Sequence, residues 1–174
     1  MTAFTRIMTV DEAHRQIEAL WVTASADECA AAARRFDWLG VETLVATLRF
    51  SGAGPIVIIA GEVRAKVSQA CVATARPVTT ALAAPFSVRL VPMAQMEAEA
   101  EACEVELSDV ALDTIGYDDA RFDVADIIAE TVALNLDPWP RSDDADVWLA
   151  EHGPGQNQPA GPFAALAALR GKSE

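Results

Sequence analysis

Three stretches within residues 42–91 have the side-chain pattern of β-strands, and this constrains the fold more than any other feature. Side chains alternate with a period of two from Glu42 to Phe50, Ile56 to Cys71 form a long strand that alternates from Glu62 onwards, and Val78 to Val91 give another strand or a bent pair. A period of two sends successive side chains to opposite faces of a β-strand. Short turn signals separate the three stretches, so they predict an antiparallel meander.

The middle strand changes character at Gly61. Before this glycine the side chains are apolar on both faces, which predicts burial on both faces. After it, polar side chains alternate with apolar ones, which predicts one solvent-facing side. A glycine at such a change is typical of a β-bulge or a bend.

Two helices are predicted from their caps. The sequence Ser25-Ala-Asp-Glu28 has the form of a capping box and predicts a helix over residues 26–38, with Gly40 as its stop. Asp123 predicts the N-cap of a second helix over residues 123–136. The side chains of that helix expected in the core are Val124, Ile127, Ile128 and Leu134.

Several segments allow two interpretations. Residues 9–20 fit either a short helix or a loop. Residues 93–102 fit a helix, but their closely spaced glutamates weaken one, so an acidic connector fits equally well. Short strands are expected at 104–107 and 110–115, and residues 163–169 form a short apolar helix that must dock on its own domain or on a partner.

These elements predict an α+β fold. An antiparallel sheet, either open or rolled towards a barrel, packs against the helices at 26–38 and 123–136. Residues 1–152 are expected to form a single domain, and residues 153–174 a Pro/Gly linker with a short C-terminal tail.

The negative charge is concentrated in one segment of that domain. The whole chain has a net charge of −13, and residues 97–146 hold sixteen acidic residues against two arginines. A field of this sign repels phosphate and favours basic partners, although it also fits a surface that is simply solvated.

The sequence predicts a cytoplasmic protein. Its three cysteines lie far apart and form no CxxC pair, which is typical of a reducing compartment. No secretory signal opens the chain, and no stretch approaches the roughly 18 apolar residues of a membrane helix.

Four basic residues fall on the polar phases of the predicted strands: Arg49, Arg64, Lys66 and Arg89. If the strands are neighbours, these side chains form a basic patch that contacts RNA phosphates. Alternatively, they pair with the acidic segment or solvate an outer face. No aromatic residue interleaves with them, so a base-stacking platform is not expected.

A second candidate site lies around the acidic segment and consists of Asp137, Trp139, Trp148 and Phe163. Each aromatic residue fits either a core position or an exposed contact for a basic protein.

No catalytic residue, metal site or cofactor is predicted. The chain has two histidines, no His-x-x-x-His spacing and no glycine-rich phosphate loop. Adjacent acids at 118–119 and 143–144 are typical of solvated charge, because a catalytic acid needs burial or special neighbours to shift its pKa. A deep pocket holding a buried acid would instead favour an enzyme.

Several segments, by their order and spacing, carry a family resemblance. The segments are Phe4-Thr5-Arg6, the strand from Glu62 to Cys71, Pro85-Phe86-Ser87-Val88, Phe122 to Glu130, Ala133 to Pro140, and Pro162 to Leu169. Together they resemble the YceD family of ribosomal RNA accumulation proteins. Many family members have further cysteines after Cys71, so this chain is most similar to a cysteine-poor, alphaproteobacterial branch, and no metal role is carried over.

The resemblance implies a bacterial, non-enzymatic factor for the accumulation of large-subunit ribosomal RNA, with no membrane or small-molecule substrate as a partner. Its expected partners are large-subunit RNA, a basic ribosomal protein, or both. The rival interpretation is an acidic adaptor or holdase that binds a basic ribosomal protein without RNA contact.

Overall fold

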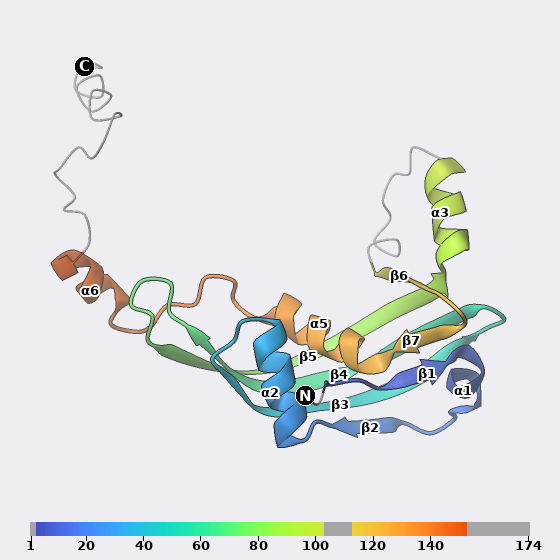
Figure 1. The fold of residues 1–174 in the computed structure, drawn as a ribbon, viewed down its shortest axis with the longest axis horizontal. Helices are drawn as coiled ribbons and strands as arrows, with labels where there is room; N and C mark the ends of the chain where they lie inside the picture. The colour runs from blue at the N-terminus through green and yellow to red at the C-terminus, as the bar shows by residue number, and fades with distance from the viewer. Residues whose placement is uncertain (1–2, 103–112, 153–174) are drawn as a thin grey trace, which may run out of the picture. The chain divides into compact units, whose positions relative to one another are not determined.

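The computed structural model describes residues 3–102 and 113–152, which fall into two compact units. The larger unit contains the described residues of Met1–Gln69 and Thr79–Pro138, and the smaller one those of Ala70–Val78 and Trp139–Glu174. The elements (Figure 1) are β1 Ile7–Thr9, α1 Val10–Arg15, β2 Leu20–Thr23, α2 Ala26–Arg35, β3 Gly40–Ala53, β4 Ile56–Ala70, β5 Pro77–Pro92, α3 Met93–Ala102, β6 Thr114–Tyr117, β7 Arg121–Asp123, α5 Val124–Asn135 and α6 Ala145–His152.

Five strands form an open mixed sheet in the order β2-β3-β4-β5-β6, which confirms the α+β prediction. The pairs β2–β3 and β3–β4 are antiparallel, as expected for a meander. β6 is parallel to β5, so the expectation of a wholly antiparallel sheet is wrong at this edge. The linear strand order shows that the sheet does not close into a barrel.

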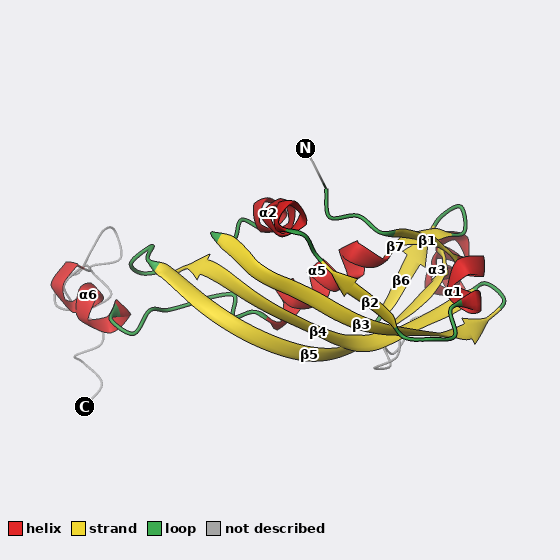
Figure 2. Ribbon diagram, turned by 90° about the horizontal axis from the view of Figure 1, so that it is seen from below, coloured by secondary structure: helices red, strands yellow, loops and turns green. Residues whose placement is uncertain are grey.

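Helices cover one face of the long strands, as the view in Figure 2 shows for α2 and α5. On that face of β4, Val57, Ile59 and Val63 are fully buried. On the other face Ile58 is half-buried and Ala60 is exposed. The prediction that the first part of this strand is buried on both faces is therefore wrong, because no described helix covers the second face.

Gly61 allows β3 and β4 to approach closely and does not mark a bulge. The register between β3 and β4 runs unbroken through the pair Leu48 and Gly61, whereas it shifts between Val41 and Thr43. A Cβ atom on Gly61 would lie 2.1 Å from the carbonyl oxygen of Thr47. The position excludes a side chain because the neighbouring backbone occupies that space.

The two predicted helices form, with the expected caps. Ser25 and Glu28 make a complete capping box at the start of α2, and the Asp123 side chain accepts from the amide of Ala125 at 2.9 Å at the start of α5. α2 ends sooner than predicted, because Asp37 adopts a left-handed φ of 55° before Gly40 is reached.

The core side of α5 is formed by fully or nearly buried residues, including Val124, Ile127 and Ile128. Leu134 was expected to join them, and this is wrong because its side chain is 85% exposed. Leu134 continues the apolar sequence pattern, but its side chain lies outside the helix face that meets the sheet.

Residues 9–20 contain the short helix α1, which has its own capping box between Thr9 and Glu12. Before it, β1 pairs with β7 to form a separate two-stranded sheet. This sheet brings residues 7–9 beside residues 121–123, with Ile7 opposite Asp123. Residues 93–102 form the helix α3 and not an irregular connector.

The remaining predictions concern the second half of the chain. Of the strand expected at 110–115, residues 114 and 115 belong to β6, and residues 110–112 lie outside the described residues. The helix α6 was not predicted. The strand expected at 104–107, the Pro/Gly linker and the C-terminal helix lie outside the described residues. Within the described parts of the chain, no helix combines the length and the apolar character needed to span a bilayer.

Candidate nucleic-acid interface

The four predicted basic residues all lie on the face of the sheet opposite α2 and α5. On β3, Arg49 follows the buried Leu48, so its side chain lies on the other face. On β4, Arg64 and Lys66 alternate with the buried residues Val63, Ala65 and Val67. Arg89 precedes the buried Leu90 on β5. The sheet therefore gathers these cations on one surface, which we call the open face.

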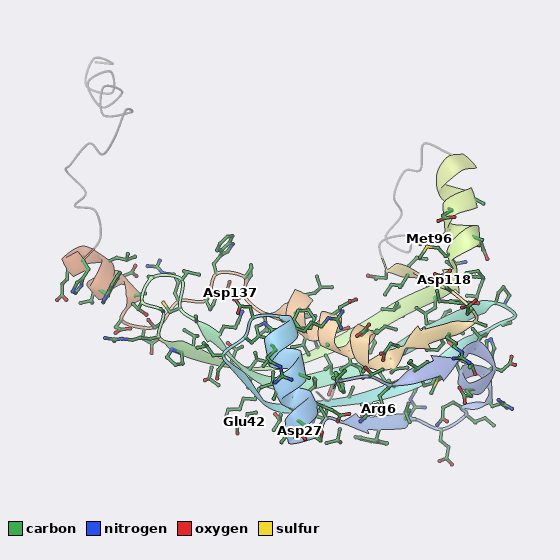
Figure 3. All side chains as sticks on the ribbon, viewed as in Figure 1. Arg6, Asp27, Glu42, Met96, Asp118 and Asp137 are labelled. Atoms are coloured by element: carbon green, nitrogen blue, oxygen red, sulfur yellow. The ribbon has the colours of Figure 1, made fainter. Side chains whose placement is uncertain are left out.

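Two of these four cations have acidic partners on the same face. Arg64 pairs with Glu62, which lies two residues earlier on the same face of β4. Lys66 Nζ lies 2.6 Å from Glu42 Oε2 (Glu42 is labelled in Figure 3). For Arg64 and Lys66, the partners therefore belong to the N-terminal half and not to the acidic segment 97–146.

The other two cations, Arg49 and Arg89, form no ion pair within the described residues. Four cations and two carboxylates leave the open face of β2 to β5 with a net charge of about +2. In a chain of net charge −13, this is a local reversal of sign.

The open face also has an aromatic side chain that the sequence interpretation missed. Trp21 lies on β2 directly opposite Thr47 of β3, and its side chain is 76% exposed. The expectation that no aromatic residue interleaves with the basic residues is therefore wrong. The alternation of Leu20 to Thr23 could have indicated a strand, but four residues give a weak signal.

Trp21 borders a shallow hollow of about 140 Å³. The hollow is lined by Trp21, Val45, Ala46, Thr47, Glu62 and Arg64. It therefore combines an aromatic ring, a short apolar floor and the Arg64–Glu62 ion pair on three adjacent strands.

On the helix-covered side, basic residues are used in structural ion pairs. Arg35 of α2 contacts both Asp126 and Glu130 of α5 and so joins the two helices. Arg6 Nη1 lies 2.5 Å from Glu28 Oε1. The hydrogen bond from Arg6 and the cap interaction with Ser25 lower the pKa of Glu28 to about 2, so this nearly buried carboxylate stays ionised.

The second predicted site is only partly described. Asp137 is exposed and its backbone carbonyl accepts from Gln69 Nε2 at 3.2 Å. Trp139 is 72% exposed, so it is not a core residue, and Trp148 is half-buried and stacks on His152 with centroids 4.9 Å apart. Phe163 lies outside the described residues.

Cys71 has an unusual setting within the smaller unit. Its sulfur accepts hydrogen bonds from the Ser142 amide at 3.3 Å, the Ser142 hydroxyl at 3.4 Å and the Thr74 amide at 3.4 Å. Burial alone would raise the pKa of the thiol, but these donors lower it to about 6. In the described ranges, no group of three or more His, Cys, Asp or Glu side chains is placed to bind a metal ion.

The paired acids show no catalytic arrangement. Asp118 and Asp119 are exposed, and Asp144 pairs with Arg76. The nearly buried acid of the described residues, Glu28, is held by a helix cap and by Arg6.

A family model described as large ribosomal RNA subunit accumulation protein YceD matches residues 59–170. No curated protein and no solved structure matches the chain. The matched region contains Arg64, Lys66 and Arg89, whereas Arg49 and Trp21 precede it.

Proposed function

The chain belongs to the YceD family of large ribosomal RNA subunit accumulation proteins, and from this premise we propose that it is a non-enzymatic cytoplasmic factor that binds large-subunit ribosomal RNA on the open face of its sheet. Its role would be to support the accumulation of that RNA by direct contact. The family membership supports large-subunit ribosomal RNA as the partner, and the positive charge of the open face supports contact through phosphates.

The observation that supports RNA contact best is the sign of charge on the open face. Arg49, Arg64, Lys66 and Arg89 outnumber the two carboxylates there, although the chain as a whole is strongly acidic. Cations that neutralise phosphates release condensed counterions, which provides most of the sequence-independent affinity for nucleic acid. A local positive surface on an acidic protein also directs the RNA to one face.

The existing ion pairs on this face do not prevent phosphate contact. The Arg64 side chain is 69% exposed and the Lys66 side chain 43% exposed. Exposed ion pairs contribute only about 0–1 kcal/mol, so exchanging a carboxylate for a phosphate oxygen costs little. Arg49 and Arg89 have no ion pair to give up within the described residues.

The test is RNA binding by a double variant of these two residues. Arg49→Gln with Arg89→Gln should weaken binding to a fluorescein-labelled fragment of large-subunit RNA, measured by anisotropy over a salt series. Each lost phosphate contact reduces the slope of log K against log salt by about 0.7 to 0.9, so two contacts should reduce it by about 1.4 to 1.8.

The matched control is Arg34→Gln with Arg121→Gln, which removes the same charge from two exposed positions outside the open face. We expect its slope to equal that of the unmodified protein. Equal loss in both double variants would indicate a non-specific charge effect and would refute the assignment of RNA to the open face.

A second candidate function rests on the acidic segment. Its sixteen acidic residues against two arginines favour a basic ribosomal protein as the partner, without RNA contact. Capture of partners from cell extract with and without ribonuclease separates the two functions. Ribosomal proteins that stay bound after ribonuclease would support the adaptor, and loss of both RNA and proteins would support RNA contact.

A further inference from the structure

The hollow beside Trp21 has no role in the fold that the described residues reveal. We propose that Trp21 stacks one unpaired RNA base over this hollow, so that the open face prefers single-stranded RNA to a duplex. This inference rests on the proposed function and adds to it the kind of RNA segment that is bound.

The ring is available for stacking because of its strand position. Trp21 lies on β2, the edge strand of the five-stranded sheet, and 76% of its surface is exposed. A single exposed hydrophobic side chain is common on proteins and suggests nothing alone. Here, however, the ring borders a hollow and lies on the open face, where four cations outnumber two carboxylates.

The neighbours of Trp21 follow from the strand register. Because Trp21 is opposite Thr47, its diagonal neighbours on the same face of β3 are Val45 and Arg49. Glu62 pairs with Thr47, and Arg64 pairs with Val45, one strand further on. The aromatic ring is thus flanked by Arg49 on one side along the strands and by Arg64 on the other.

The charges are arranged for a base with a phosphate beside it. Inside the hollow, the ion pair of Arg64 with Glu62 leaves little net charge, which suits a neutral base. Beside the hollow, Arg49 has no ion pair among the described residues and suits a phosphate. The guanidinium of Arg64 can in addition lie against the base, since its planar group stacks on π-systems.

This arrangement favours unpaired RNA for a geometric reason. In a duplex each base is already stacked between its neighbours, and the deep, narrow major groove of A-form RNA hides the base edges from side chains. An unpaired base can turn outward and stack on an aromatic residue. A duplex can reach the cations of the open face but not the ring of Trp21.

The experiment compares two labelled RNAs of about twelve nucleotides or base pairs, one an unstructured oligoadenylate and one a duplex. Binding is measured by anisotropy for the unmodified protein, Trp21→Ala, Trp21→Phe and Leu134→Ala. We expect Trp21→Ala to lose at least about fivefold in affinity for the single strand, because stacking on one aromatic side chain has that effect. Its affinity for the duplex should be unchanged.

Leu134→Ala is the matched control, since Leu134 is 85% exposed and lies on α5, outside the open face. It should bind both RNAs like the unmodified protein. Trp21→Phe should retain most of the single-strand affinity, because phenylalanine keeps an aromatic face. Subtracting the emission of Trp21→Phe from that of the unmodified protein isolates the Trp21 fluorescence, and the single strand should quench it more than the duplex.

The outcomes separate this inference from the function on which it rests. If Trp21→Ala binds the single strand normally while Arg49→Gln with Arg89→Gln weakens it, the open face binds RNA but the stacking inference is wrong. Equal loss for both RNAs would refute the single-strand preference. If the unmodified protein binds the large-subunit RNA fragment but neither of these two RNAs, the inference is wrong and the proposed function stands. If it binds none of the three RNAs, both are wrong.

Discussion

Replacing Glu28 with glutamine tests how strongly one carboxylate ties the N-terminal segment to α2. Glu28 Oε1 accepts from Arg6 Nη1 at 2.5 Å, and Oε2 accepts from the Ser25 amide at 2.8 Å. Glutamine also serves at this position of a capping box. Glu28→Gln therefore keeps the cap and removes the charge that faces Arg6.

The expected magnitude follows from the pKa of Glu28. The Arg6 hydrogen bond, with the cap, lowers this pKa from 4.5 to about 2. At about 1.4 kcal/mol per unit, the full shift corresponds to about 3 kcal/mol. The Arg6 side chain is 43% exposed, so solvent screens the pair. We therefore expect a loss of about 1–2 kcal/mol at neutral pH, or about 2–8 °C in Tm.

The pH dependence has a definite sign. The folded-state pKa lies below the unfolded one, so this stability is complete above about pH 5 and is lost as the pH falls towards 2. The assay is urea unfolding followed by circular dichroism at about pH 7 and about pH 3, where roughly half the contribution should remain. The difference between the unmodified protein and Glu28→Gln should shrink accordingly.

Glu12→Gln provides the control, because Glu12 forms the same capping box with Thr9 in α1 but has no ion pair within the described residues. It should lose much less stability than Glu28→Gln. Equal losses in the two variants, or a loss in Glu28→Gln that does not change with pH, would refute the assignment of the stability to the Arg6 pair.

Three further predictions concern packing and the thiol. Gly61→Ala should lose about 3 kcal/mol of unfolding free energy, measured with urea, because its Cβ would lie 2.1 Å from a backbone oxygen. Gly40→Ala, with nothing within 4 Å of its Cβ, should change little. A tolerated Gly61→Ala would contradict the close approach of the two strands. Ile128→Ala should cost about 2–5 kcal/mol and Leu134→Ala less than about 0.5, since their exposed fractions are 0% and 85%; similar losses would contradict the orientation of α5. Thiolate absorbance in the difference between the unmodified protein and Cys71→Ser should rise with a midpoint of about 6; a midpoint above the ordinary value for a thiol would contradict the donor arrangement around the sulfur.

Local sequence patterns predicted the elements whose signals are contained in a few neighbouring residues. The capping box of Ser25 with Glu28, the N-cap at Asp123 and the period-two strands were all confirmed. The phase of Arg49, Arg64 and Lys66 was predictable for the same reason, because alternation along one strand decides which face a side chain occupies. Each depends on contacts within one turn of helix or one strand.

The four-residue strand β2 shows where local patterns become insufficient. Four residues are too few for a reliable period, so the sequence left 9–20 open and assigned no strand to Leu20–Thr23. Its pairing with β3 places Trp21 beside the basic residues. The candidate site was therefore predicted without its aromatic member.

The sequence by itself determined the class of the fold, the long strands, the capped helices and the phase of the basic residues, because these depend on local periodicity and capping. Only the tertiary structure decided that β6 runs parallel to β5, that β1 pairs with β7, and that the described helices α2 and α5 cover the same face of the sheet. These features depend on contacts between residues far apart in the chain. No local preference specifies such contacts, since they arise when apolar faces find a common core.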